Sequence, residues 1–250
     1  MGDSDYIIKN GILKEYTGTD SNAIVPDGVT SIGLTFAFCE NLTSVVLPCG
    51  ITSIESHAFW SCENLTSVTL PDSLTSIDDW AFDGCLNLMN ITLPSKLISI
   101  GYEVFRECKK LEVFISGNPS FEEAAFSCVK KIIAPNISLS EFLTIKEKRA
   151  AARGFLSNYS LYKNKAIIED YIKYIISQKK QLLSEILLED DVLSLAVYIE
   201  IKKHNIKSFL GEYLQPAEKA KAQKCLAFLL EWEDKNILDI YNLQQLKEIL

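Results

Sequence analysis

A repeat of 23 residues dominates the first half of the sequence and limits what the chain can fold into. The same three residue types return at this step in four copies. They are Phe36, Phe59, Phe82 and Phe105; Cys39, Cys62, Cys85 and Cys108; and Leu42, Leu65, Leu88 and Leu111. A shortened fifth copy follows at Ala125-Phe126, Cys128 and Pro135. Self-similarity at a fixed period of about 20 to 50 residues indicates a repeat architecture.

The pattern inside one unit predicts how the chain runs through a coil. Residues 65–70 read L-x-x-V-x-L, the spacing of a short strand with one buried face. Pro71 then ends the strand, because proline has no backbone N–H to donate. Leu74 and Ile77 form a second apolar pair directed inward. One coil cannot enclose its own apolar face, so successive coils must stack, roughly 4.8 Å apart.

With its A-F-x-x-C and L-T-S-V-x-L-P signatures in register, the unit resembles the BspA-type leucine-rich repeat. The resemblance covers roughly residues 20–135. It implies a leucine-rich-repeat solenoid. Proteins of this class are generally binding or adhesion modules, many of them on bacterial surfaces, and they are not enzymes. This sequence differs from the surface-displayed members in lacking an evident leader or wall anchor.

We expect an α+β protein of two domains. The first, residues 1–137, is a solenoid of about five coils with a β-hairpin cap at residues 5–16. Asn10-Gly11 lies between two apolar-polar runs in this segment and predicts a type I′ turn. From residue 138 the repeat disappears and helix-forming residues dominate, so residues 138–250 are predicted to form an all-helical domain.

The helical half is expected to consist of stacked helical hairpins, with Asn205 and Pro216 as helix starts. Candidate helices cover residues 140–153, 165–178, 179–189, 191–202, 206–213, 216–233 and about 240–249. The run from Leu214 is weakly similar to the helix pair of an ankyrin repeat. The T-P-L-H signature of that repeat is missing, so hairpin stacking of any helical solenoid explains the pattern equally well.

Charge argues against several classes of partner. The net charge is −8, and residues 1–135 hold 8 Lys+Arg against 17 Asp+Glu. Nucleic acids and anionic lipids need clustered positive charge, so neither is expected to bind the first half. No apolar run is long enough to span a membrane, and the first residues lack the features of a signal peptide. As written, we expect a cytoplasmic monomer; if a leader was removed, we expect a cell-surface or secreted protein.

Neither the cysteines nor the histidines predict a metal-binding or catalytic site. Four of the seven cysteines recur once per coil, and this spacing lacks the paired C-x-x-C clusters of zinc sites. We interpret them as small buried hydrophobic residues. His57 and His204, the only two histidines, have no Cys or Ser partner at a recognisable spacing and fit turn positions. We therefore expect no catalytic residues, no bound metal and no cofactor.

Two surfaces remain as candidate partner-binding sites. Polar residues alternate along the predicted strands and line one sheet face; they include Ser44, Ser67, Thr69, Asn90 and Thr92. Solvated strands favour Thr and Ser in any case. On the turn side Trp60, Trp80 and Tyr102 break the repeat consensus with aromatics, which interfaces favour but which equally pack on neighbouring coils.

The size of the strand face limits its function. Five coils with strands of about 18 Å give about 430 Å², whereas a standard interface takes about 800 Å² per partner. The first hypothesis is a non-catalytic protein–protein interaction module that binds an unknown protein, with the helical half as a cap and second surface. The alternative is a bacterial adhesin-like surface protein that binds host matrix or glycans, and a third is an enzyme with an unusual site.

Overall fold

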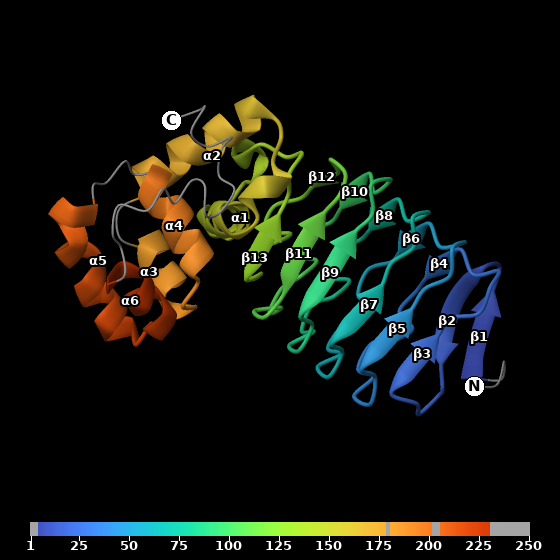
Figure 1. The fold of residues 1–250 in the computed structure, drawn as a ribbon. Coiled ribbons are helices and arrows are strands. Elements are labelled where there is room, and N and C mark those ends of the chain that lie inside the picture. Colours follow the sequence, from blue (N-terminus) through green and yellow to red (C-terminus); the bar gives the residue numbers. More distant parts are fainter. Residues whose placement is uncertain (1–4, 179–180, 202–205, 231–250) are drawn as a thin grey trace. The chain divides into compact units, whose positions relative to one another are not determined.

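The structure is a computed structural model that describes residues 5–178, 181–201 and 206–230 (Figure 1). The chain forms two compact units. The first unit comprises residues 1–136 and 142–150, and the second comprises residues 137–141 and 151–250. The expected boundary between residues 137 and 138 stays a prediction. Residues 142–150 follow that boundary in the sequence but belong to the first unit.

The repeats of the first unit form two parallel sheets, each built from one strand per coil (Figure 1). The hairpin strands β1 (Tyr6–Lys9) and β2 (Ile12–Tyr16) begin one sheet, which continues through β4 (Ser31–Ile32), β6 (Ser53–Ile54), β8 (Ser76–Ile77), β10 (Ser99–Ile100) and β12 (Ser120–Phe121). The other sheet contains β3 (Asn22–Ile24), β5 (Ser44–Val46), β7 (Ser67–Thr69), β9 (Asn90–Leu93), β11 (Glu112–Ile115) and β13 (Lys131–Ile133). Corresponding residues of successive coils pair directly, as Ser44 does with Ser67.

The solenoid has about six turns between residues 12 and 133, one more than the repeat count predicted. Strands β3 and β4 belong to the additional turn, which lacks the A-F-x-x-C part of the unit. A repeat is recognised in the sequence by its consensus residues. A turn of the solenoid, however, needs only two short strands that pair with the next coil. The first turn therefore folds without carrying the whole signature.

The predicted β-hairpin covers the first coil. β1 and β2 pair antiparallel, and Asn10 and Gly11 connect them with φ of 53° and 76°, as a type I′ turn requires. β2 also pairs in parallel with β4. The ring of Tyr16 packs on that of Phe36, with centroids 5.3 Å apart. These contacts confirm the hairpin cap.

The core of the first unit contains a continuous row of fully buried rings, which we call the phenylalanine stack. Its members are Phe36, Phe59, Phe82, Phe105 and Phe126. Neighbouring ring centroids lie 4.9 to 5.7 Å apart, and all four pairs are stacked. A side chain at the same position of every coil thus meets its own kind above and below, which explains the strict 23-residue step.

The four cysteines that recur once per coil follow the same axis, and none of the seven cysteines forms a disulfide. Cys62, Cys85 and Cys108 are fully buried. Each thiol donates a hydrogen bond to the carbonyl oxygen of a phenylalanine 26 residues earlier, with S–O distances of 2.8, 3.2 and 3.1 Å. A buried thiol that already has an acceptor behaves as a small apolar residue with a weak donor.

Two positions in most coils have left-handed backbone geometry, with φ between 47° and 76°. They lie two residues before and two residues after a member of the phenylalanine stack. The first set is His57, Trp80, Glu103 and Ala124, and the second is Phe38, Ser61, Gly84 and Glu107. Only one of these eight residues is glycine, so the turn geometry and not the local residue fixes the backbone.

A buried carboxylate joins the first helix to the last coil within the first unit. Helix α1 (Ile145–Ser157) begins with a capping box, in which the Thr144 hydroxyl accepts a bond from the Glu147 N–H at 3.1 Å. The Glu147 carboxylate accepts from the Thr144 N–H at 2.9 Å. Its other oxygen accepts from the Phe126 N–H at 3.0 Å, and the side chain is fully buried.

The second unit is helical, as predicted. After the short 3-10 helix η2 (Leu139–Glu141) it contains the remainder of α1, η3 (Tyr159–Leu161), α2 (Lys165–Ser177), α3 (Gln181–Leu188), α4 (Val192–Ile201), α5 (Ile206–Ala220) and α6 (Gln223–Leu230). In this described part no helix is long and apolar enough to cross a membrane. The expected helix at 240–249 and the roles of His204 and Asn205 lie outside the described residues.

Two helix boundaries differ from the sequence analysis. The first helix begins at Ile145 and not at residue 140, because Thr144 supplies the N-terminal cap. Pro216 does not begin a helix but lies inside α5, which continues to Ala220. The chain turns instead at Lys221, whose φ is 57°. A left-handed residue ends a helix, whereas a proline removes one donor and crowds the preceding turn but can be accommodated inside a helix.

Candidate functional site

The polar strand positions form the rows that the sequence predicts. Ser44 pairs with Ser67 and Ser67 with Asn90 across β5, β7 and β9. Strands β7 and β9 pair at this one position only, whereas β9 and β11 pair at four. A shallow hollow of about 330 Å³ lies beside this pair. Thr69, Asn90 and Thr92 all line it, so the structure brings these three predicted residues together.

The predicted aromatic residues of the turns belong to a larger continuous surface, which we call the aromatic ladder. Its members are Phe38, Trp60, His57, Trp80 and Tyr102. Consecutive ring centroids in this order lie 4.7, 5.3, 5.2 and 5.5 Å apart. The ladder crosses four successive coils. Trp60, Trp80 and Tyr102 therefore pack on residues of neighbouring coils and remain accessible at the same time.

The exposed area of the ladder is large for apolar side chains. Phe38 keeps 58% of its surface exposed, and Trp60 and Tyr102 each keep 37%. His57 and Trp80 are half-buried between these rings. Interface residues of proteins are enriched in such partly exposed aromatics, because they bury much area with few rotatable bonds.

Sequence reasoning missed two members of the ladder. Phe38 stands at the left-handed position that Ser61 and Gly84 occupy in the next coils, so the repeat alignment gives no aromatic signal there. His57 was interpreted as an isolated turn residue. It stacks on Trp80, its equivalent in the next coil, and meets Trp60 edge-on. Comparing each turn residue with its equivalent 23 residues later would have found this second contact.

Carboxylates surround the ladder. An Asp79 oxygen accepts a bond from the Tyr102 N–H at 2.8 Å, and a Glu103 oxygen accepts from the Trp80 indole N–H at 3.2 Å. Burial, followed by the nearby charges of Asp79 and Glu55, raises the pKa of Asp78. Negative charge is thus concentrated around the rings of these coils.

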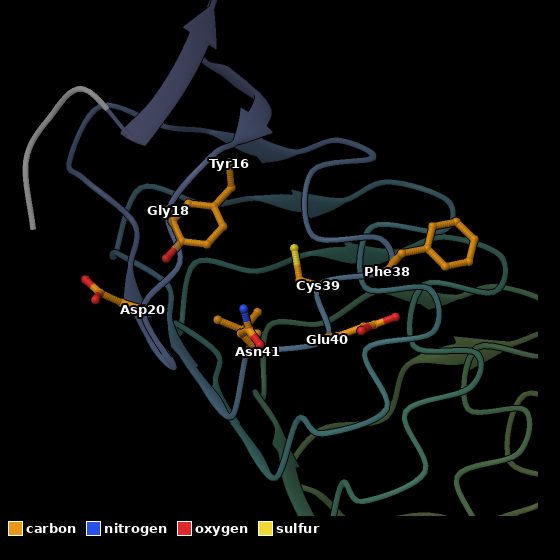
Figure 2. A pocket seen from close by; sticks show the side chains of 8 residues that line it. Tyr16, Gly18, Asp20, Phe38, Cys39, Glu40 and Asn41 are labelled. Carbon is orange, nitrogen blue, oxygen red and sulfur yellow. The ribbon is translucent and has the colours of Figure 1, made fainter.

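A second hollow of about 270 Å³ lies beside the hairpin (Figure 2). Tyr16, Asp20, Cys39 and Glu40 are among its lining residues. Figure 2 shows the Phe38 ring pointing away from Tyr16, and that ring contacts Trp60 of the ladder. Burial, helped by neighbouring Cys62, raises the pKa of the Cys39 thiol to about 11, so this thiol is protonated at neutral pH and a poor nucleophile.

The arrangement is suited to binding. Within the described ranges, no group of three or more His, Cys, Asp or Glu side chains is placed to hold a metal ion. His57 contacts aromatic rings on both sides. What the surface offers to a partner is stacked apolar area with carboxylates at its margin.

Two parallel sheets closed by a repeated turn define a solenoid repeat protein. Residues 14–133 match the family model described as the BspA type leucine rich repeat region, in six copies. This segment is a BspA-type leucine-rich repeat region, as the resemblance implied. The class consists of non-enzymatic repeat proteins that commonly serve as protein-interaction or surface modules.

Solved structures similar to this chain are bacterial leucine-rich repeat proteins. A leucine rich repeat protein from T. pallidum is 27% identical, with 53% of this chain and 70% of that chain covered and a TM-score of 0.48. One from Bacteroides capillosus is also 27% identical, with 47% and 98% covered and a TM-score of 0.41. A leucine rich cell surface protein from Faecalibacterium prausnitzii is 21% identical, with 54% of each chain covered and a TM-score of 0.36. No curated protein matches the chain.

Proposed function

We propose that this protein is a non-catalytic protein-interaction module, and that the aromatic ladder is its principal contact surface. The observation that carries the proposal is the ladder itself. Phe38, Trp60 and Tyr102 expose large apolar areas in one contiguous row. Burying such area on a partner releases about 25 cal/mol per Å², whereas leaving it in water contributes nothing to folding.

The local backbone supports a role beyond stability for these rings. Phe38, His57 and Trp80 have φ of 61°, 60° and 53°, in the left-handed region where glycine is least strained. The same geometry recurs with small or polar residues such as Ser61 and Ala124, so the turn leaves the residue type open. The turn does not require aromatic rings at three of these positions, and a recognition surface accounts for them.

The polar rows of β5, β7 and β9 extend the contact area. Ser44, Ser67, Thr69, Asn90 and Thr92 supply hydroxyl and amide groups, and the hollow between β7 and β9 offers a shallow recess. The strand face alone is too small for a standard interface, at about 430 Å² against about 800 Å² per partner. We infer that the ladder, and the helical unit as a second surface, supply the remaining area.

The test compares capture of partners by the natural chain and by a variant with Phe38→Ala and Trp60→Ala. The matched control is Ile98→Ala, because Ile98 is also an exposed apolar residue, 66% accessible, but lies in the other turn of the coil. We expect the double variant to lose the partner that the natural chain and the control retain. Circular dichroism and melting must show that all three are folded.

Two results would count against the proposal. If a folded double variant captures the same protein at the same level, the ladder is not the contact surface. If the chain instead fractionates to the cell surface and binds host matrix or glycans, the adhesin-like alternative replaces the interaction module. Recovery from the cytoplasmic fraction with a specific protein partner is the expected outcome.

A further inference from the structure

Three of the four coils that carry the ladder contain no positive charge. Residues 15–95 include 10 Asp and Glu residues and no Lys or Arg. The gap extends from Lys14 to Lys96, and only the coil of Tyr102 adds basic residues, Arg106 among them. Negative charge therefore prevails along most of the ladder, which favours cations over anions.

The carboxylates nearest the rings are only weakly paired. Arg106 lies 3.9 Å from both Asp83 and Glu103, at the outer limit of an ion pair, and its own side chain is half exposed. Among the residues that the structure describes, Asp79 forms no ion pair, although it accepts a bond from the Tyr102 N–H. Exposed pairs at such distances contribute little, so much of the negative charge remains available to a ligand.

We propose that the aromatic ladder binds an extended, arginine-containing segment of a partner protein, a specificity that rests on the interaction role proposed above. The guanidinium group is planar, always charged and weakly hydrated, so it stacks on aromatic faces and pairs with carboxylates at the same time. Trp60 and Trp80 supply the rings, and Asp79 and Glu103, which are bonded to Tyr102 and Trp80, supply the carboxylates beside them. A neutral or acidic segment would leave these charges without a partner.

The dimensions of the ladder favour a short linear segment over a folded surface. Four coils at roughly 4.8 Å give a ladder of about 14 Å, which an extended chain of four or five residues spans at about 3.3 Å per residue. Two arginines in such a segment reach two steps of the ladder. A globular partner would need about 800 Å², more than this row presents.

The experiment uses the full chain and a synthetic peptide of alternating arginine and serine, eight residues long. The control peptide carries citrulline in place of arginine, which keeps the shape and removes the charge. Binding is measured by calorimetry and by tryptophan fluorescence. We expect the arginine peptide to bind at least about tenfold more tightly than the citrulline peptide. Raising the salt from 50 to 200 mM should weaken binding about threefold or more, because screening acts on exposed charges.

Variants assign the binding to the ladder. Trp60→Ala and Asp79→Asn should each weaken arginine-peptide binding about threefold or more, since one removes a ring and the other a charge. The matched control is Asp27→Asn, because Asp27 is an exposed acid located in the other turn of an earlier coil. It should change binding by less than about twofold.

Several outcomes would overturn the proposal. If the two peptides bind equally, or if Trp60→Ala binds the arginine peptide as well as the natural chain does, the ladder does not recognise arginine. Binding of a neutral cello-oligosaccharide but not of the arginine peptide assigns the ladder to glycans. Sedimentation that shows a dimer lost in Trp60→Ala assigns it to a second copy. If capture of a protein still depends on the ladder while the arginine peptide fails, the interaction role stands and only this specificity is wrong.

Discussion

At the scale of single residues, the solenoid requires left-handed backbone where it turns, and it tolerates nearly any side chain there. Ser61, Gly84 and Glu107 occupy the same place in successive coils with φ of 54°, 76° and 61°. The backbone is held by hydrogen bonds between coils, such as the bond from the Gly84 N–H to the Arg106 carbonyl oxygen at 3.0 Å. Because the geometry comes from the neighbouring coil, the residue type is free to serve the surface.

Gly84→Ala tests this interpretation of the turn. An added Cβ would meet the Ser61 side chain at 3.2 Å and its backbone at 3.3 Å, and φ at this site is +76°. We expect the substitution to lower the free energy of unfolding by about 1 kcal/mol. Urea denaturation measures the change.

Ser61→Gly is the matched control for Gly84→Ala, because it places glycine at the equivalent position of the preceding coil. The relief of backbone strain and the added entropy of the unfolded chain oppose each other, so we expect a change of less than about 0.5 kcal/mol. A stable Gly84→Ala protein together with a destabilised Ser61→Gly protein would contradict our account of the turn.

At the scale of elements, long-range caps determine where helices begin. Glu147 caps α1 and also accepts from the Phe126 N–H of the last coil, 21 residues earlier. Asp190 caps α6 from a distance, accepting from the Lys224 and Cys225 N–H groups at 2.9 and 2.8 Å. In both cases one carboxylate satisfies donors at a helix start and fixes another segment against it.

Glu147→Ala should destabilise the first unit strongly. The Phe126 N–H would lose its acceptor in a buried place and the Thr144 N–H in a partly buried one, at a cost of about 1 to 3 kcal/mol each. We expect a loss of about 2 to 4 kcal/mol in the free energy of unfolding, measured by chemical denaturation. Glu123→Gln, which changes an exposed carboxylate, is the control and should be neutral. A loss below about 1 kcal/mol would show that water replaces the carboxylate.

The cap at Asp190 makes the stability of the second unit depend on pH. Burial opposes ionisation of this carboxyl, but bonds from the Cys225 and Lys224 N–H groups outweigh it, and the pKa of Asp190 is lowered. A lowered pKa in the folded state means that the stabilisation is fully present well above the unfolded value of 3.8 and is lost as pH falls from there through the folded value. Asp190→Asn should cost about 1 kcal/mol at pH 7 and remove this part of the acid dependence. Melting temperatures of both proteins between pH 2 and 7 measure this acid dependence. If the two proteins show the same dependence on pH, the Asp190 carboxylate does not stabilise the second unit as a helix cap.

At the scale of the whole molecule, the sequence predicts what repeats and little of what does not. The 23-residue step places the phenylalanine stack, the thiols and the strand rows, because equivalent positions of stacked coils have equivalent surroundings. The 23-residue step does not predict contacts between residues at different positions of the repeat. Phe38 joins the ladder through Trp60, a residue at a different position of the repeat, and Glu147 reaches Phe126 from outside the repeat. The helix break at Lys221 likewise depends on a backbone angle that composition does not encode.

The two compact units should unfold as separate cooperative transitions, each with its own interior. Phe82 is fully buried, with rings stacked on both faces, so Phe82→Ala should cost about 3 to 5 kcal/mol in the first unit. Asp190→Asn acts only in the second. In differential scanning calorimetry we expect two peaks, with Phe82→Ala lowering one and Asp190→Asn lowering the other. A single peak that both substitutions shift together would mean that the repeat solenoid and the helical unit fold as one cooperative structure, and that a ligand on one must stabilise both.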